Sequence, residues 1–109
     1  MNIYEPVRMP ELAGSSTANR PAAMVVENPP EARLVFFRIG PGQEVATHTS
    51  ASAVFISVLS GGGFVSGAEG ERPVRAGMVA AIAAGEPHGM RAGDDELLLA
   101  ALIAPRPGG

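Results

Sequence analysis

The chain has 109 residues, a net charge of −3 at pH 7 and no cysteine. A chain of this length folds as one domain around a single core, so we expect one site per chain. The absence of cysteine excludes disulfides, thiolate nucleophiles and cysteine-based zinc or iron–sulfur sites. Any metal must therefore be bound by histidine, carboxylate or hydroxyl groups.

The charge pattern argues against nucleic acid as a partner. All eight basic residues are arginines, scattered from Arg8 to Arg106, whereas a surface that follows phosphates needs clustered basic side chains. No apolar run approaches the roughly 20 residues that span a bilayer. The N-terminus also lacks the basic start and apolar core of a secretory signal. We expect no nucleic-acid partner, no membrane association and a cytoplasmic location.

Residues 1–21 differ from the remainder of the chain. They contain three prolines and the polar string 14–19, and they show no helical apolar period. We interpret them as an irregular N-terminal arm with room for at most one short strand. Residues 22–109 are predicted to form a single β domain.

From Ala22 onward, short apolar runs alternate with turns rich in glycine and proline, a spacing typical of an antiparallel sandwich or barrel. Strands are predicted at 22–27, 32–39, 44–49, 52–59, 64–66, 73–76, 78–84 and 96–104, with a tight hairpin at 61–63 and a turn at 93–95. Leucine and alanine in residues 96–104 favour a helix. Because Pro105 ends this run early and every neighbour is a strand, we predict a strand there.

Each of the two histidines lies in a segment with regularly spaced glycines and small residues. The anchor positions of the two segments are Gly42, His48, Ser50, Val54 and Gly61, and then Gly77, Ala83, Gly85, His88 and Ala92. These spacings resemble the two sequence motifs of the cupin superfamily, and the resemblance covers roughly residues 32–104. It implies an all-β fold, a small double-stranded β-helix (jelly-roll) barrel of the cupin type.

The same resemblance implies a metal site and shows how this chain departs from it. In metal-binding cupins the ligands are two histidines and a glutamate of the first motif and one histidine of the second. This chain keeps His48 and His88, but it has Ser50 at the second histidine position and Val54 at the glutamate position. Two of the four usual ligands are therefore absent.

Two imidazoles alone make a weak site, because zinc sites and the iron facial triad use at least three protein ligands. A zinc, nickel, manganese or iron ion at His48 and His88 would need a third ligand. Ser50 is a poor ligand when neutral, which leaves a carboxylate such as Glu44 or Glu86 turning inward. By strand alternation Glu44 shares a face with His48, although it lies beside a turn.

Strand alternation also predicts the inner wall of the barrel. His48 and Ser50 share one face with Val54, Ile56 and Val58, so a polar end leads into branched aliphatic side chains. We predict a ligand pocket formed by His48, Ser50, Val54, His88 and Met90, since methionine fills irregular apolar space. Met78 is expected to line it as well.

Other roles for these residues stay open. A lone histidine in a small barrel is commonly a half-buried residue that bonds backbone or water, and an imidazole can also transfer protons near neutral pH. Nucleophilic catalysis by Ser50 is disfavoured, because it has no strained elbow or acid partner. Arg38 and Arg91 would bind a substrate carboxylate only if they face inward.

The sequence supports two functional hypotheses. The first is a binding module whose pocket holds a small, mostly apolar molecule, with His48, Ser50 and His88 fixing its polar end. The second, which the resemblance implies, is a metal-dependent cupin enzyme of the dioxygenase, isomerase or decarboxylase kind acting on a small oxygenated substrate. The predicted strands 22–27 and 32–39 are apolar on both faces, so we also expect a homodimer.

Overall fold

A computed structural model describes residues 1–10, 12 and 20–108. The described chain contains a short 3-10 helix and a series of strands that cover most of the predicted β domain. They are η1 (Pro6–Arg8), β1 (Ala22–Glu27), β2 (Arg33–Ile39), β3 (Glu44–His48), β4 (Ala53–Gly67), β5 (Gly70–Arg75), β6 (Val79–Ile82) and β7 (His88–Ala104). The fold is all-β, as predicted, and the run 96–104 is confirmed as part of a strand.

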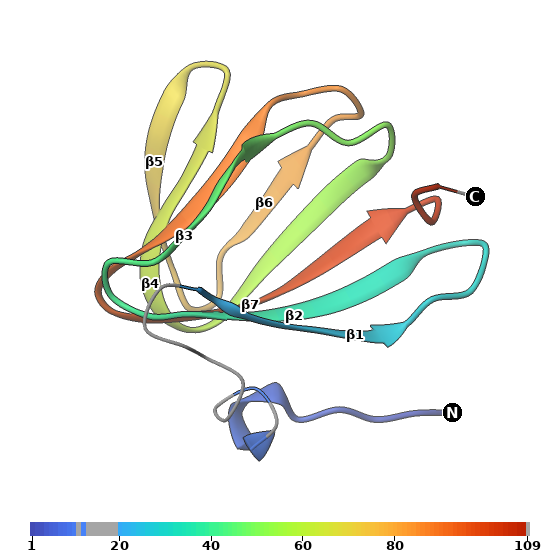
Figure 1. The fold of residues 1–109 in the computed structure, drawn as a ribbon, viewed down its shortest axis with the longest axis horizontal. Coiled ribbons are helices and arrows are strands. Elements are labelled where there is room, and N and C mark those ends of the chain that lie inside the picture. Colours follow the sequence, from blue (N-terminus) through green and yellow to red (C-terminus); the bar gives the residue numbers. More distant parts are fainter. Residues whose placement is uncertain (11, 13–19, 109) are drawn as a thin grey trace.

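All strand pairs are antiparallel, and they form one continuous sheet that folds over into two layers (Figure 1). The first layer contains, in order, β1, β2, the C-terminal half of β7, the N-terminal half of β4, and β6. The second layer contains β3, the N-terminal half of β7, the C-terminal half of β4, and β5. The two long strands β4 and β7 therefore belong to both layers and hold them together, as in a jelly roll.

The glycine triplet 61–63 and the segment 93–95 are where β4 and β7 pass from one layer to the other. The predicted hairpin at 61–63 and the predicted turn at 93–95 are therefore wrong, because both strands continue through these points. Gly61 pairs with Leu97 and Gly63 pairs with Ala92, so Gly62 alone on β4 corresponds to residues 93–96 on β7. Such a bulge bends a strand without ending it.

Gly61 is required at this bend for two reasons. Its φ angle is +70°, a region that residues with a Cβ rarely adopt. A Cβ placed on it would also lie 1.7 Å from the carbonyl oxygen of Glu96. The close approach of β4 to β7 at the layer boundary thus depends on this glycine.

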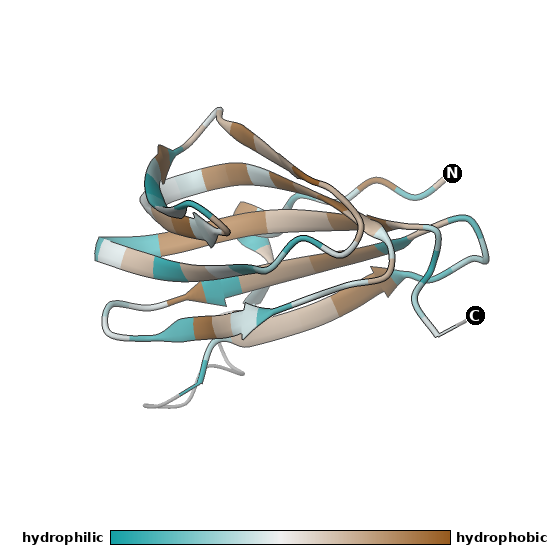
Figure 2. Ribbon diagram, turned by 90° about the horizontal axis from the view of Figure 1, so that it is seen from above, coloured by the Kyte–Doolittle hydropathy of each residue, from teal (hydrophilic) through white to brown (hydrophobic). Residues whose placement is uncertain are grey.

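Burial alternates along β4 as strand geometry requires. Val54, Ile56 and Val58 are buried between the layers, whereas Phe55 between them is 41% exposed on the outer face. The main core cluster joins these residues to Ile39, Leu97, Leu99 and other apolar residues of both layers. Figure 2 shows the corresponding pattern of hydrophobic segments within strands and hydrophilic ones at many of the connections.

The described part of the N-terminal arm packs against the outer face of the first layer. Leu12 is completely buried in a second apolar cluster with Ala22, Phe36 and Leu98, and the ring of Tyr4 lies edge-on to Phe36 at 5.7 Å. The arm contains the 3-10 helix η1, and residues 1–10 and 12 form no strand. The polar string 14–19 lies outside the described residues.

A polar contact fastens the start of the arm to β1. The Tyr4 hydroxyl donates to the carboxylate of Glu27, and the side-chain amide of Asn2 donates to the same carboxylate at 2.7 Å. Both hydrogen bonds lower the pKa of Glu27, the bond from Tyr4 having the larger effect, and the bond to Glu27 raises the pKa of Tyr4. Among the described residues, no helix is long and apolar enough to cross a membrane.

Candidate functional site

A bulge in β3 decides which side chains point between the layers. Glu44 pairs with Arg91 and Val45 with Met90, but the next pair is His48 with His88, so β3 has one residue more than β7 over this interval. The extra residue reverses the alternation, which turns His48 to the same side as Val45 and leaves Glu44 on the opposite side.

Gly89 allows β3 to lie this close to β7. A Cβ on Gly89 would be 2.9 Å from the carbonyl oxygen of Val45 and 3.1 Å from the backbone nitrogen of Thr47. Both distances are shorter than ordinary van der Waals contacts. A side chain at this position would push β3 away and separate the two histidines.

The structure brings the two histidines into direct contact. The ring centroids of His48 and His88 are 4.3 Å apart, and the ring planes are inclined by 56°. His88 is only 2% exposed, whereas His48 is exposed at the end of β3. One imidazole therefore lies inside the barrel and the other lies at its edge.

Both rings are oriented in the same way by their own strands. Nδ1 of His48 donates to the carbonyl oxygen of Ala46 at 2.9 Å, and Nδ1 of His88 donates to the carbonyl oxygen of Glu86 at 3.0 Å. A carbonyl can only accept, so Nδ1 carries the hydrogen in both rings. In the neutral form each ring then has its lone pair on Nε2, and within the described part of the chain neither Nε2 has a hydrogen-bond partner.

The two rings border a cavity of about 340 Å³ between the layers. Its polar end consists of His48, His88, Thr49 and Ser50, and its wall is apolar. The apolar lining is Phe37, Val45, Ala51, Val54, Ile56, Met90, Ala101, Ile103 and Pro107. The volume and the mixture of a long apolar wall with a few convergent polar groups are typical of small-molecule sites.

All five residues predicted to form the pocket line this one cavity: His48, Ser50, Val54, His88 and Met90. Val54 is 4% exposed and Met90 is 5% exposed, which places both in the inner wall. Met78 is not among the lining residues. It is 38% exposed and borders a separate groove of about 490 Å³ between β5 and β6, so that expectation was wrong.

Sequence reasoning missed part of the wall, including Phe37 of β2 and Ala101 and Ile103 of β7. Phe37 alternates with Phe36, and both faces of β2 are apolar, so hydrophobicity alone does not show which one faces the cavity. Phe37 could have been identified because it lies two residues before Ile39 and so shares its face of the strand. Ile39 is completely buried in the main core. The face of β7 on which Ala101 and Ile103 lie could not be counted from His88, because the bend at 93–96 interrupts the alternation.

The donor set does not fit the metal site of metal-binding cupins. Glu44 lies on the outer face beside Arg91, and Glu86 accepts a hydrogen bond from the backbone nitrogen of Ala83 at 3.1 Å. Neither carboxylate lines the histidine cavity, so neither supplies the third ligand considered above. In residues 1–10, 12 and 20–108, no group of three or more His, Cys, Asp or Glu side chains is arranged to hold a metal ion.

Arg91 faces away from the cavity as well. It forms two hydrogen bonds with the carboxylate of Glu71, at 2.7 and 3.0 Å, and its guanidinium lies 4.1 Å from the centre of the Phe64 ring. The hydrogen bonds from Arg91 lower the pKa of Glu71. An inward role for Arg91 in binding a substrate carboxylate is therefore excluded in this arrangement.

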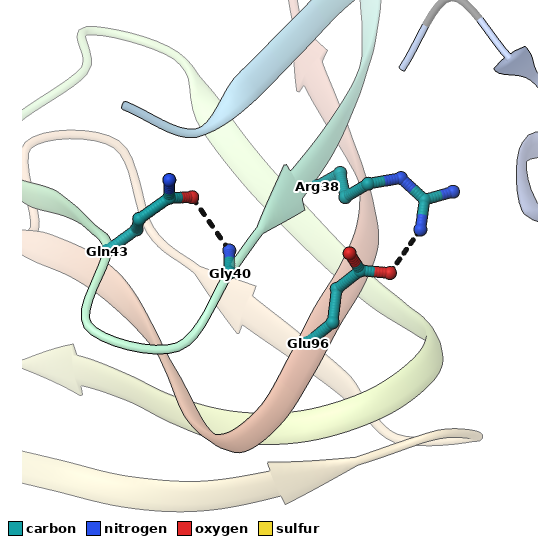
Figure 3. A network of polar contacts seen from close by, with 4 residues as sticks. All are labelled: Arg38, Gly40, Gln43 and Glu96. Carbon is teal, nitrogen blue, oxygen red and sulfur yellow. Dashed lines mark hydrogen bonds and ion pairs between the residues drawn. The ribbon is translucent and has the colours of Figure 1, made fainter. Parts of the chain in front are cut away.

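Arg38 is also bound elsewhere. Its Nη1 contacts the carboxylate of Glu96 on β7, and beside it the side chain of Gln43 accepts a hydrogen bond from the backbone nitrogen of Gly40 at 2.8 Å (Figure 3). Arg38 shares a face of β2 with Phe36, which belongs to the outer cluster. Neither arginine considered from the sequence lines the histidine cavity.

A folded-over antiparallel sheet with a pocket between its layers defines a double-stranded β-helix protein. A family model described as "Cupin domain" matches residues 35–104, which is more than half of the chain. The chain belongs to the cupin domain family, and the resemblance drawn from the two histidine segments is confirmed. No curated protein sequence matches it significantly.

Solved structures give the same fold. A conserved double-stranded β-helix protein from Klebsiella pneumoniae has a TM-score of 0.85 at 22% identity, over 100% of this chain and 94% of that one. The TT1209 protein of Thermus thermophilus has a TM-score of 0.74 at 29% identity, over 81% and 86% of the two chains. A protein of Thermotoga maritima described as a predicted oxalate decarboxylase has a TM-score of 0.65 at 26% identity, over 69% and 68%.

Proposed function

We propose that this cupin domain binds a small, mostly apolar molecule in the cavity between its layers without using a metal ion. The observation that carries the proposal is the composition of the cavity: a long apolar wall with His48, Ser50 and His88 at one end. Val54 occupies the position where metal-binding relatives carry a glutamate, and an aliphatic side chain cannot donate electrons to a metal. A homodimeric state and a cytoplasmic location stay predictions from the sequence.

One observation favours a second candidate, a metal-dependent enzyme. Metal-binding histidines commonly donate their other ring nitrogen to a backbone carbonyl, and both His48 and His88 do so through Nδ1. The Thermotoga maritima neighbour is described as a predicted oxalate decarboxylase, which is an enzyme. This candidate needs a third ligand that the described side chains around the cavity do not supply.

Filling the cavity should abolish binding while leaving the fold intact. Ala101 is 3% exposed and lines the cavity, so Ala101→Leu places extra methyl groups in the space that a ligand would occupy. We expect 4-methylphenol or 4-methylanisole to shift the NMR amide signals of Ser50, Val54 and Met90 in the wild-type protein. In the variant the affinity for both probes, measured from these shifts, should fall about tenfold or more.

The matched control is Ala81→Leu, because Ala81 is exposed and does not line the cavity. This variant should bind both probes as the wild-type protein does. If neither probe perturbs the cavity residues in the wild-type protein, or if Ala101→Leu binds them equally well, the cavity is not the binding site and the proposal is wrong.

A further inference from the structure

We propose that the head group recognised by the two histidines is a neutral hydroxyl, of an alcohol, phenol or enol, and that a carboxylate or an ether oxygen is bound more weakly. This inference rests on the proposed function and adds to it the chemical class of the ligand. It follows from the hydrogen-bonding capacity of the polar end of the cavity, from the charges that line it and from its apolar wall.

The first step concerns the imidazoles. Because Nδ1 of His48 and of His88 donates to a backbone carbonyl, each neutral ring has only the acceptor Nε2 left for a ligand. The ring centroids are 4.3 Å apart, so the two rings lie side by side at this end of the cavity. A ligand group without a hydrogen to donate would place its own lone pairs against those of Nε2.

The second step concerns the hydroxyl of Ser50, which lies at the same end of the cavity. Its Oγ accepts a hydrogen bond from the backbone nitrogen of Ser52 at 3.1 Å, so its hydroxyl hydrogen is free to donate. The polar end of the cavity therefore combines acceptors from the imidazoles with a donor from Ser50. A ligand hydroxyl matches both, because it donates one hydrogen bond and accepts others.

The third step concerns charge. Among the residues that the structure describes, no Asp, Glu, Lys or Arg side chain lines the cavity. A carboxylate would enter without a fixed cation to pair with, and an ammonium group would enter without a carboxylate; an unpaired charge in a largely apolar site is costly. The lining thus favours a head group that is neutral in its bound form.

The fourth step concerns the wall. Phe37 and Met90 supply an aromatic ring and a thioether, which pack well against a flat ring. Val54 and Ile56 supply buried branched aliphatic surface. A small aromatic or branched aliphatic body carrying one hydroxyl fits these walls.

The test compares three probes of nearly equal size that differ in their head group: 4-methylphenol, its methyl ether 4-methylanisole, and the anion 4-methylbenzoate. Binding is measured by NMR titration of chelator-treated protein at about pH 8, where imidazole is ordinarily neutral. We expect 4-methylphenol to bind at least about tenfold more tightly than 4-methylanisole, because a site built for a hydroxyl rejects analogues that lack it. The anion should bind most weakly.

Two variants connect this selectivity to the imidazoles. His88→Leu should weaken 4-methylphenol about three- to tenfold and leave 4-methylanisole nearly unchanged, since one neutral hydrogen bond is lost. If that variant does not fold, His48→Leu serves the same purpose, because His48 is exposed and contributes little to the core. Thr47→Val is the control: Thr47 is exposed on β3 and does not line the cavity, so this variant removes a hydroxyl without changing the polar end.

The outcomes separate the inference from the proposed function. If the ether binds within about twofold of the phenol, if the benzoate binds more tightly than the phenol, or if phenol binding requires added zinc, the inference is overturned while the cavity is still a binding site. If none of the three probes shifts the cavity signals, the proposed function itself fails.

Discussion

A Ser50→His, Val54→Glu double variant is expected to bind zinc stoichiometrically, whereas the wild-type chain does not. Both positions line the cavity beside His48 and His88, and the two substitutions restore the full ligand set of metal-binding relatives. At zinc concentrations about 100 times the dissociation constant, binding stabilises the native state by about 2.7 kcal/mol. For a domain of this size that corresponds to an increase in Tm of roughly 10 °C or more.

The control for this experiment is the Ser50→Asn, Val54→Gln variant, which introduces similar volume with much poorer metal ligands. Without zinc, the first variant should be less stable than the wild-type protein, because Val54 is 4% exposed and a carboxylate there is buried without a partner. Thermal unfolding with and without zinc checks both expectations. An equal increase in Tm for the wild-type chain would contradict the view that its metal site is incomplete.

The Gly61→Ala variant is expected to lose more than about 3 kcal/mol of unfolding free energy, and it should fail to fold if the domain is only marginally stable. The added Cβ would meet the carbonyl oxygen of Glu96 at 1.7 Å, and this contact is to backbone rather than to a movable side chain. Relief requires β4 and β7 to separate at the bend that joins the two layers. Denaturant unfolding measures the loss.

Gly85→Ala separates the steric clash from the cost of the backbone conformation. Gly85 has a φ angle of +82°, similar to that of Gly61, but a Cβ there meets nothing within 4 Å. This variant should lose only about 1–2 kcal/mol, the ordinary cost of a left-handed conformation for a residue with a side chain. Equal losses of unfolding free energy at the two positions would show that the close approach of β4 to β7 does not depend on Gly61.

The fold class could be predicted because local signals agreed along the chain. Strands β1 and β2 are marked by β-branched and aromatic runs with proline or glycine at their ends, and the spacing around His48 and His88 matches the family motifs. The bends at 61–63 and 93–96 were mistaken for a hairpin and a turn. Glycines and aspartates appear at both kinds of structure, and only long-range pairing distinguishes a bent strand from two strands.

The cavity-lining residues could be predicted in part, for a similar reason. Val54 was predicted from the family spacing and Met90 from the gap-filling character of methionine, and both lie in the cavity wall. The bulge that turns His48 inward and Glu44 outward depends on the pairing of β3 with β7, so counting along β3 alone gave Glu44 the wrong face. Phe37 was missed because its strand is apolar on both sides.

The most direct test of a metal-free pocket is elemental analysis of the untagged wild-type protein, combined with thermal unfolding after adding zinc, nickel, manganese or iron. We predict well under one metal ion per chain and no increase in Tm with any of the four metals, because a ligand bound only by the native state must stabilise it. A stoichiometric metal ion that is lost in His48→Ala or His88→Ala would contradict this account and favour the metal-dependent enzyme.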